Sequence, residues 1–253
     1  MNKIALITGA TSGIGEACAK KFAAAGYDLI VTGRRTDRLE QVKSNLLADF
    51  PIKILPLTFD VQDRNAVESS LGKLPDTWRQ IDVLINNAGL AAGRDLFADA
   101  DMNDWETMLN TNVHGLLYVT KTVVPWMIAR HKGHIINMGS IAAKEVYEKG
   151  NVYCASKSAV DALSRAMRID LLQHHIKVTA IHPGAVETEF SLVRFKGDEA
   201  QAAATYKGIT PLTASDIADT IFYCAGLPDH VCINDLVITC TQQADAFYFN
   251  KNK

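Results

Sequence analysis

The sequence predicts an α/β fold in which a doubly wound parallel sheet of about seven strands carries helices on both faces. Short apolar runs alternate with segments of helical periodicity along the chain, and a glycine-rich turn follows the first run. This alternation indicates a parallel sheet that is covered by helices on both sides. The runs that we expect to form strands are residues 4–7, 28–32, 53–57, 83–85, 134–138, 177–181 and 236–239.

Helices are expected between these runs. Gly26 and Gly133 follow the first and the longest helical segment, and we expect each to end its helix. Residues 184–213 lack a clear element, and we expect a substrate lid there, because long loops in compact domains are usually functional or disordered. No linker divides the chain, so residues 1–253 are expected to form a single domain with a C-terminal tail at about 241–253. The segments predicted to be helical are residues 15–25, 38–48, 105–130 and 156–172.

Composition excludes several classes of partner. The net charge is −2 and the pI is about 6.4, without a basic stripe, which argues against nucleic acid or an anionic membrane as a main partner. No apolar run is long enough to span a bilayer, and Met1, Asn2 and Lys3 lead directly into the first strand, so we expect a cytoplasmic protein. The five cysteines lack CxxC spacing, and no histidine has metal-ligand neighbours, so neither disulfides nor a metal site is expected.

The first strand runs into the sequence Thr-Gly-Ala-Thr-Ser-Gly-Ile-Gly at residues 8–15. A turn of this kind brings backbone amides close to a pyrophosphate, and the start of the following helix supplies positive potential. The GxxxGxG spacing differs from GxGxxG, and glycines alone could form only a tight turn between strand and helix. Because the turn directly follows the first strand, we favour a nucleotide pocket in a Rossmann-type domain.

The second strand ends in a glycine followed by Arg34 and Arg35. A site that prefers NAD usually carries an acidic residue here for the ribose hydroxyls, whereas guanidinium groups bind phosphate oxygens well. These arginines therefore predict NADP, although they could instead be solvated charges at a helix start. Asp37 is expected to stabilise the start of the next helix, and Asp60 and Val61 are expected to border the adenine.

Tyr153 and Lys157 stand four positions apart in a helix-compatible segment. Side chains at this spacing share a helix face, so the Lys157 charge can favour the anion of Tyr153. A free tyrosine, with a pKa of about 10, is a poor proton-transfer group at neutral pH. Alone, the two residues could be an ordinary surface pair. Cys154 points to another side of the helix and is expected to be buried filler.

Taken together, these motifs resemble the short-chain dehydrogenase/reductase family over essentially the whole chain. Longer stretches at 82–90, 105–108, 150–153 and 187–198 resemble its NADP-dependent 3-hydroxy acid dehydrogenases. That subgroup oxidises serine, allo-threonine and related 3-hydroxy acids, reduces malonic semialdehyde, and is typically tetrameric. The resemblance thus implies an NADP-dependent oxidoreductase and a homotetramer. The matching residues are the glycine turn, Asn86, Asn87, Ala88, Gly89, Asn112, Ser140, Tyr153, Lys157, Pro183 and Gly184.

The same resemblance implies catalytic roles. Tyr153 would exchange a proton with the substrate oxygen, and Ser140 would hydrogen-bond that oxygen. Lys157 would lower the pKa of Tyr153 and hold the nicotinamide ribose, and Asn112 would admit a water that links Lys157 to solvent. Besides Tyr153, Lys157 and the adenine-side residues, the implied cofactor-binding residues are Gly9, Ser12, Gly13, Ile14, Gly15, Asn87, Pro183, Gly184, Val186 and Thr188.

The substrate end departs from the subgroup at residues 141–144 and 148–149, so the acceptor can differ. A buried carboxylate needs a partner, and we expect Arg194 in the lid to supply it, with Lys144 as the second candidate. One alternative is a reductase of neutral carbonyls with the same catalytic set. Another is a cofactor-binding regulator without turnover, against which the complete catalytic set argues. The aromatic run at 247–249 is expected to pack on the domain or on another subunit.

Overall fold

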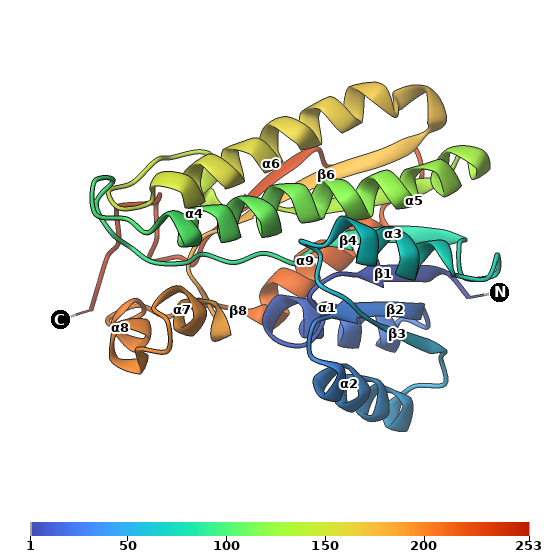
Figure 1. Cartoon of the computed structure of the whole chain (residues 1–253), viewed down its shortest axis with the longest axis horizontal. Coiled ribbons are helices and arrows are strands. Elements are labelled where there is room, and N and C mark those ends of the chain that lie inside the picture. The colour runs from blue at the N-terminus through green and yellow to red at the C-terminus, as the bar shows by residue number, and fades with distance from the viewer. Residues whose placement is uncertain (1, 253) are drawn as a thin grey trace.

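The computed structural model describes residues 2–252 and contains a seven-stranded sheet in the order β3-β2-β1-β4-β5-β6-β9. Neighbouring strands are parallel, and helices cover both faces (Figure 1). The predicted fold class is therefore confirmed, and each predicted apolar run overlaps one strand. These strands are β1 (Ile4–Ile7), β2 (Asp28–Gly33), β3 (Ile54–Thr58), β4 (Ile81–Asn86), β5 (Gly133–Met138), β6 (Ile176–Pro183) and β9 (Asp235–Ile238).

Side chains alternate across the sheet and divide the core into two clusters. Ala5 and Ile7 of β1 belong to the cluster completed by α1, α2 and α9, whereas Ile4 and Leu6 pack with α3 and α5. Because both faces are covered, β1 is a continuous apolar run. No helix within residues 2–252 has the length and apolar composition needed to cross a bilayer. The main helices are α1 (Gly13–Ala24), α2 (Thr36–Asp49), α3 (Arg64–Gly72), α5 (Leu116–Arg130), α6 (Asn151–Asp170) and α9 (Ala214–Gly226).

The segment predicted as one helix at 105–130 consists of three parts. A π-helix at Asn110–Gly115 joins α4 (Met102–Leu109) to α5. Apolar periodicity could not reveal the π-helix, because this wider turn interrupts the hydrogen-bond pattern without reversing the chain.

The two glycines predicted to end helices behave differently. Gly26 follows α1 with a φ of +80°, as expected for a helix stop. The prediction for Gly133 is wrong, because α5 ends at Arg130 and His131 takes the left-handed conformation with a φ of 48°. Gly133 instead begins β5, where a Cβ atom would lie 2.4 Å from the sulfur of Met127. Close packing, rather than chain reversal, thus requires this glycine.

The region at 184–213 is not the elementless loop that the sequence predicts. It contains two short helices, α7 (Glu189–Arg194) and α8 (Glu199–Ala204), and a small sheet formed by β7 (Val186–Glu187) and β8 (Leu212–Thr213). Such short elements show too few repeats for periodicity to be detected. In Figure 1 they form a lobe beside the carboxyl ends of the central strands. We refer to residues 184–213 as the lid.

The C-terminal tail, described to residue 252, folds back against the lid. Gln243 and Phe249 form an antiparallel bridge, and the amide of Asn252 donates a 2.7 Å hydrogen bond to the carbonyl of Gly208. The side chains of Phe247 and Tyr248 remain 54% and 72% exposed. More than half of each of these two residues therefore stays exposed, and packing on another subunit remains an expectation.

Candidate active site

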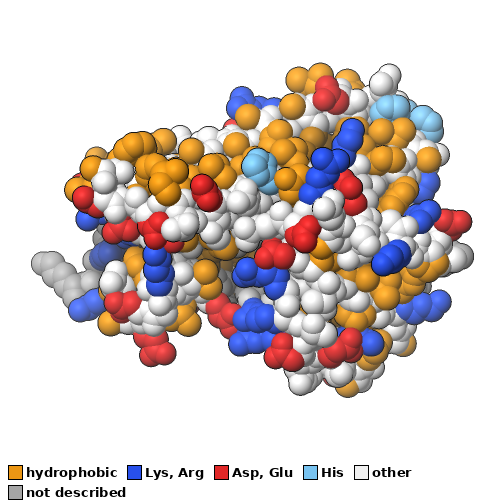
Figure 2. Space-filling model, viewed as in Figure 1, with side chains coloured by type: hydrophobic (Ala, Val, Ile, Leu, Met, Phe, Trp, Pro, Cys, Tyr) orange, Lys and Arg blue, Asp and Glu red, His pale blue; other side chains and the backbone are white. Residues whose placement is uncertain are grey.

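A cavity of about 1100 Å³ lies at the carboxyl ends of the central strands, between the sheet and the lid. In the sheet β2 lies on one side of β1 and β4 on the other, so the strand order reverses direction at β1. Ligands of open α/β sheets bind at such a switch point. Figure 2 shows this hollow between the lid and the rest of the molecule, with basic and acidic side chains close together at its mouth.

The glycine turn forms one end of the cavity. Gly9 and Gly13 have φ values of +66° and +54°, which side chains rarely allow. Gly15 lies behind the lining, where a Cβ atom would stand 2.2 Å from the carbonyl oxygen of Gly9. Ser12, the N-cap of α1, makes no side-chain cap hydrogen bond, and Ile14 completes the lining. The first amides of α1 are therefore available to an anion.

Arg34 and Arg35 both line the cavity beside this turn. A nitrogen of Arg34 lies 3.5 Å from a carboxylate oxygen of Asp60. Arg35 donates a 2.9 Å hydrogen bond to the hydroxyl of Thr11, which fixes its guanidinium over the turn. Asp37 lies in the first turn of α2, as predicted.

Sequence reasoning missed a third arginine and its acidic partner. Arg38 is one helical turn beyond Arg35, and its guanidinium lies 2.9 Å from the carboxylate of Glu189 in the lid. Arg35 lies 3.6 Å from the same carboxylate. The spacing of the arginines could have identified Arg38, but nothing in the sequence links α2 to a residue 151 positions away. These charges join the lid to the rest of the domain.

Asn87, the residue after β4, braces the glycine turn. Its amide nitrogen donates hydrogen bonds of 2.9 and 3.1 Å to the carbonyls of Thr8 and Gly9. Asn87, Asp60 and Val61 all line the cavity.

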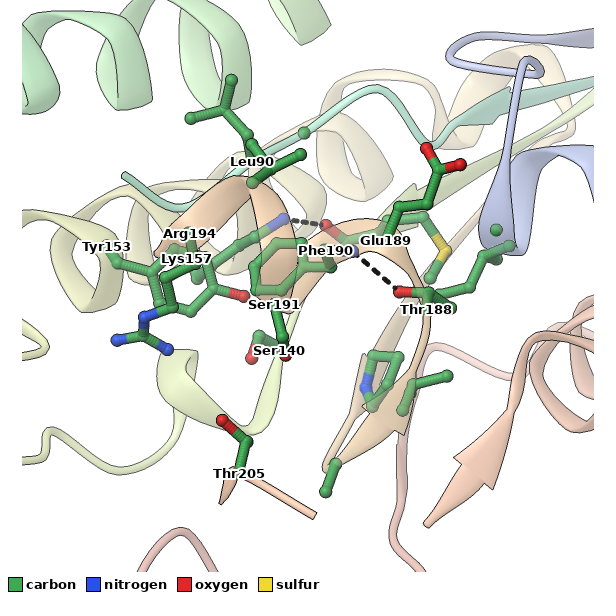
Figure 3. A pocket seen from close by; sticks show the side chains of 18 of the residues that line it. Leu90, Ser140, Tyr153, Lys157, Thr188, Glu189, Phe190, Ser191, Arg194 and Thr205 are labelled. Atoms are coloured by element: carbon green, nitrogen blue, oxygen red, sulfur yellow. Dashed lines mark hydrogen bonds between the residues drawn. The ribbon is translucent and has the colours of Figure 1, made fainter. Parts of the chain in front are cut away.

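The end of β6 forms the middle of the cavity, with Pro183, Gly184, Val186 and Thr188 in its lining. Thr188 caps α7 by accepting a hydrogen bond from the Phe190 amide (Figure 3). Gln243, which sequence reasoning missed, fixes this segment from the tail. Its side-chain oxygen accepts a 2.8 Å hydrogen bond from the Ala185 amide and leaves no room for a Cβ atom on Gly184.

Tyr153, Lys157 and Ser140 meet at the other end of the cavity (Figure 3). Tyr153 and Lys157 project from α6, and Ser140 follows β5 as the N-cap of a 3-10 helix at Ile141–Ala143. The ammonium of Lys157 lies 6.0 Å from the centroid of the Tyr153 ring and donates a 2.8 Å hydrogen bond to the carbonyl of Met138. The predicted pair therefore shares a buried helix face rather than the surface.

The electrostatics of this group differ from the sequence prediction. Burial raises the pKa of Tyr153, while a hydrogen bond from Ser140 and the positive charge of Arg194 act to lower it. Lys157, whose ammonium donates to the Met138 carbonyl, is not one of the largest influences on this pKa. Burial lowers the pKa of Lys157 to about 8, so the ammonium still holds its proton at neutral pH.

Asn112 lies in the π-helix, next to Lys157 but behind the cavity lining. Its side chain accepts a hydrogen bond from the Leu90 amide and donates one to the Leu90 carbonyl, each of 2.8 Å. A Cβ atom on Gly89 would lie 3.2 Å from the Asn112 oxygen and 3.4 Å from the Lys157 nitrogen. Only Gly89 therefore separates the side chains of Asn112 and Lys157. Short π-helices like this one are frequent at functional sites.

Arg194 reaches the cavity from α7. Its guanidinium lies 5.6 Å from the ring centroids of both Tyr147 and Tyr153, in cation–π range. Its buried Nε atom finds no hydrogen-bond partner among residues 2–252. Arg94, which the sequence did not single out, also lines the cavity. This part of the cavity is therefore positively charged, and one buried donor there is free for an anion.

The prediction for Lys144 is corrected by the structure. The 3-10 helix after Ser140 turns Lys144 away from the cavity, and its ammonium pairs with Asp161, at 3.1 Å, and with Asp235. A lysine held by two carboxylates outside the cavity is not available to a substrate.

Three comparisons with known proteins agree with this geometry. The short chain dehydrogenase family is matched over residues 3–198. The chain is 46% identical to the NADP-dependent 3-hydroxy acid dehydrogenase YdfG of Salmonella typhi, over 96% of this chain and 97% of that protein. It is 45% identical to a sulfoacetaldehyde reductase of Chromohalobacter salexigens, over 96% of each chain. The closed form of serine dehydrogenase complexed with NADP+ aligns with a TM-score of 0.91 and 43% identity, over 99% of this chain and 100% of that one.

Proposed function

The chain belongs to the short chain dehydrogenase family, and we propose that it transfers hydride between NADP and a small 3-hydroxy acid or the corresponding 3-oxo acid. Serine, allo-threonine, 3-hydroxypropionate and 3-hydroxyisobutyrate are substrates of the expected size. The observation that carries the proposal is that Ser140, Tyr153 and Lys157 meet with Arg194 in one cavity that begins at the glycine turn. One arrangement thus combines a proton donor, an anion partner and a nucleotide site.

The residues at the glycine turn fit a dinucleotide. Gly9, Ser12, Gly13 and Ile14 would surround the pyrophosphate, because their backbone leaves room and the first amides of α1 are uncapped by Ser12. Gly15 would act from behind by allowing this close packing. Arg34 and Arg35 would hold the 2′-phosphate and so favour NADP, while Asp60 and Val61 would border the adenine and Asn87 the ribose. The NADP named for the relatives supports this choice.

Pro183, Gly184, Val186 and Thr188 would frame the nicotinamide, which supplies the hydride when it is bound. The substrate carbon must then lie between this segment and Tyr153. Gln243 would keep the segment in place through its hydrogen bond to Ala185.

Tyr153 would give its phenol proton to the substrate oxygen in reduction and take it back in oxidation. Ser140 would donate a hydrogen bond to that oxygen where negative charge develops. Lys157 would hold the nicotinamide ribose and pass the proton toward Asn112, where the π-helix would admit a water linked to solvent. The lowered pKa of Lys157, which results from burial, suits a group that exchanges a proton near neutral pH.

Arg194 is the proposed partner of the substrate carboxylate. Its position over Tyr153 would place an anionic group beside the reacting carbon, and its buried Nε atom can donate to that anion. A sulfonate has a similar charge and would also fit this description, as the sulfoacetaldehyde reductase relative indicates. The alternative is that the same catalytic set acts on neutral ketones or sugars. Such substrates have no anionic group for Arg194 to bind.

A substrate panel tests the proposed function. The purified protein would be assayed by NADPH absorbance with serine, 3-hydroxypropionate and 3-hydroxyisobutyrate, with sulfoacetaldehyde in reduction, and with neutral alcohols and ketones of equal size. The proposal expects the highest kcat/KM with a carboxylate substrate. Preference for neutral compounds would support the alternative, and absence of turnover on every compound would contradict an enzymatic role.

We also propose a homo-oligomer, with a tetramer favoured, that works in the cytoplasm. Ile169, at the end of α6, and Leu172, just beyond it, are 75% and 72% exposed, which suits packing against another copy. Phe247 and Tyr248 of the tail are exposed in the same way. The cysteines are free thiols in the described chain, as expected in a reducing compartment.

A further inference from the structure

We propose that His182 is a positioning residue that fixes Ser140 relative to Tyr153 through a charged network that runs from the buried His182 to the surface. The network consists of His182, Lys144, Asp161 and Asp235, which we call the His182 network. Its function depends on the proposed role of Ser140, but its members lie outside the cavity lining. None of them is therefore required to touch cofactor or substrate.

His182 is fully buried on β6 and packs directly against the backbone that carries Ser140. Its Nδ1 atom lies 3.3 Å from the amide nitrogen of Ser140 and 3.1 Å from the carbonyl oxygen of Ser140. Gly139, which precedes Ser140, donates a 2.7 Å hydrogen bond to the carbonyl of Ile181, which precedes His182. A Cβ atom on Gly139 would lie 2.4 Å from Nδ1, so the imidazole and this backbone are in close contact. The residues just before the catalytic hydroxyl are thus held by β6.

The other ring nitrogen of His182 selects the tautomer. Its Nε2 atom lies 3.6 Å from an oxygen of Asp161 and 3.5 Å from an oxygen of Asp235, beyond hydrogen-bond distance but directed at two acceptors. Carboxylates favour a proton on the facing nitrogen. The Ser140 carbonyl, 3.1 Å from Nδ1, favours a proton on Nδ1 instead, so the two sides of the ring compete. In the proposal the carboxylates prevail, and Nδ1 accepts from the Ser140 amide. Burial lowers the pKa of His182, which agrees with a neutral ring.

Lys144 keeps the Asp161 carboxylate charged. Its ammonium lies between Asp161 and Asp235, and Arg165 lies 3.3 Å from Asp161. Burial opposes ionisation of Asp161, but the hydrogen bond and charge of Lys144 lower its pKa overall. His182 and the two aspartates are close enough to share a cation, but Lys144 already occupies the space between the carboxylates. The geometry therefore favours an ion-pair network over a metal site.

The network connects the parts of the protein that carry the catalytic groups. Lys144 is four residues beyond Ser140, and Asp161 is one helical turn beyond Lys157 on α6. Ser140 and Tyr153 stand on separate elements, and their hydroxyls must reach the same substrate oxygen. A small displacement of one group relative to the other reduces the rate strongly, because proton transfer depends on the distance between them. The His182 network holds the two elements in register.

Two substitutions of His182 separate positioning from packing. Asparagine places its side-chain oxygen near the Nδ1 position and can accept from the Ser140 amide, whereas glutamine reaches the Nε2 position and leaves that amide without an acceptor. We expect His182→Gln to lower kcat by about tenfold or more, with His182→Asn within about threefold of the wild type, since one lost hydrogen bond corresponds to this range. The KM for NADP should change little in either variant.

Equal losses of kcat in the two variants, or full kcat in His182→Gln, would overturn the proposal. If neither variant folds, Asp161→Asn provides the test. The new side-chain amide can donate to Nε2, which moves the ring proton to Nδ1. Nδ1 then cannot accept from the Ser140 amide. We expect kcat to fall, while NADPH binding, measured by fluorescence, is retained. An unchanged kcat in Asp161→Asn would also overturn the proposal.

The tautomer can be measured without turnover. In ¹⁵N-histidine-labelled wild-type protein, the His182 signals, assigned by their loss in His182→Asn, should show a neutral ring protonated at Nε2. Protonation at Nδ1 would reject the mechanism whatever the substrate proves to be. Failure of the substrate panel with the expected tautomer would instead count against the proposed function alone.

Discussion

The two ends of the cavity are built in different ways. The proposed cofactor end consists of backbone from one short segment, residues 9–15, braced by Asn87 and flanked by the arginines that follow β2. The substrate end is assembled from side chains of α6, α7, the loop after β5 and the tail, which are far apart in the sequence. A site made of backbone tolerates few changes in shape, whereas one made of distant side chains can change specificity without altering the fold.

Replacement of Tyr153 by phenylalanine should separate the two ends most strongly. We expect kcat to fall by about a thousandfold or more, because general acid–base catalysis commonly contributes 10²–10⁴-fold. Binding of NADPH, measured by fluorescence titration, should remain within about threefold of the wild type because the glycine turn is untouched. A loss of binding equal to the loss of kcat would show that the two ends are not independent.

Replacement of Ser140 by alanine should lower kcat by about a hundredfold, the usual effect of removing one donor to a developing oxyanion. It should also move the pH dependence of oxidation. The hydrogen bond from Ser140 lowers the pKa of Tyr153, so its removal raises that pKa and moves the rising limb of the profile to higher pH. Steady-state oxidation rates across the alkaline range measure this shift. A shift to lower pH would mean that Ser140 does not favour the phenolate.

At the cofactor end, Arg34→Ala combined with Arg35→Ala should raise the KM for NADP by about a hundredfold, as expected from losing charge-assisted hydrogen bonds to a phosphate. The KM for NAD should change much less. Arg64→Ala is a matched control, because Arg64 pairs with Glu68 on the exposed surface of α3. Parallel losses for NADP and NAD would remove the basis of the cofactor assignment.

At the substrate end, Arg194→Ala should raise the KM for carboxylate substrates by about tenfold or more, since a buried anion would lose its partner. Neutral ketones of the same size should be affected much less. The ratio of the two effects in steady-state assays is the measurement. An equal effect on both substrate classes would reject Arg194 as the anion partner.

The smallest effect concerns stability. Burial lowers the pKa of Lys157 to about 8, so the folded protein binds fewer protons than the unfolded chain between that pH and the ordinary lysine range, and wild-type stability should rise with pH there. Lys157→Met removes the cost of burying the ammonium, about 3 kcal/mol, but leaves the Met138 carbonyl unpaired at about 2 kcal/mol. Denaturant titration at neutral pH should show a net gain of about 1 kcal/mol, with no rise above pH 8. A less stable variant would mean that the ammonium is well solvated in the folded state.

The glycine turn and the Tyr153–Lys157 pair could be predicted from the sequence because each is a local pattern. Gly9, Gly13 and Gly15 belong to one turn, and Tyr153 and Lys157 share one helix face, so spacing alone indicates proximity. The lid helices and the Glu189 partner of Arg38 could not be predicted, since short elements give no periodicity and a contact across 151 positions leaves no local signal. The prediction of Lys144 as a substrate partner was wrong for a related reason. One turn of 3-10 helix decides whether its side chain faces the cavity or Asp161.

The carboxylate of Glu189 already rests on Arg35 and Arg38, two of the basic groups beside the proposed phosphate position. When the dinucleotide binds, its phosphate would therefore replace the Glu189 carboxylate as the partner of these arginines. The guanidinium groups are not unpaired before binding. The net gain depends on how much better a doubly charged phosphate serves these arginines than a single carboxylate does. The number of arginines alone would thus overstate how strongly ionic strength governs cofactor affinity.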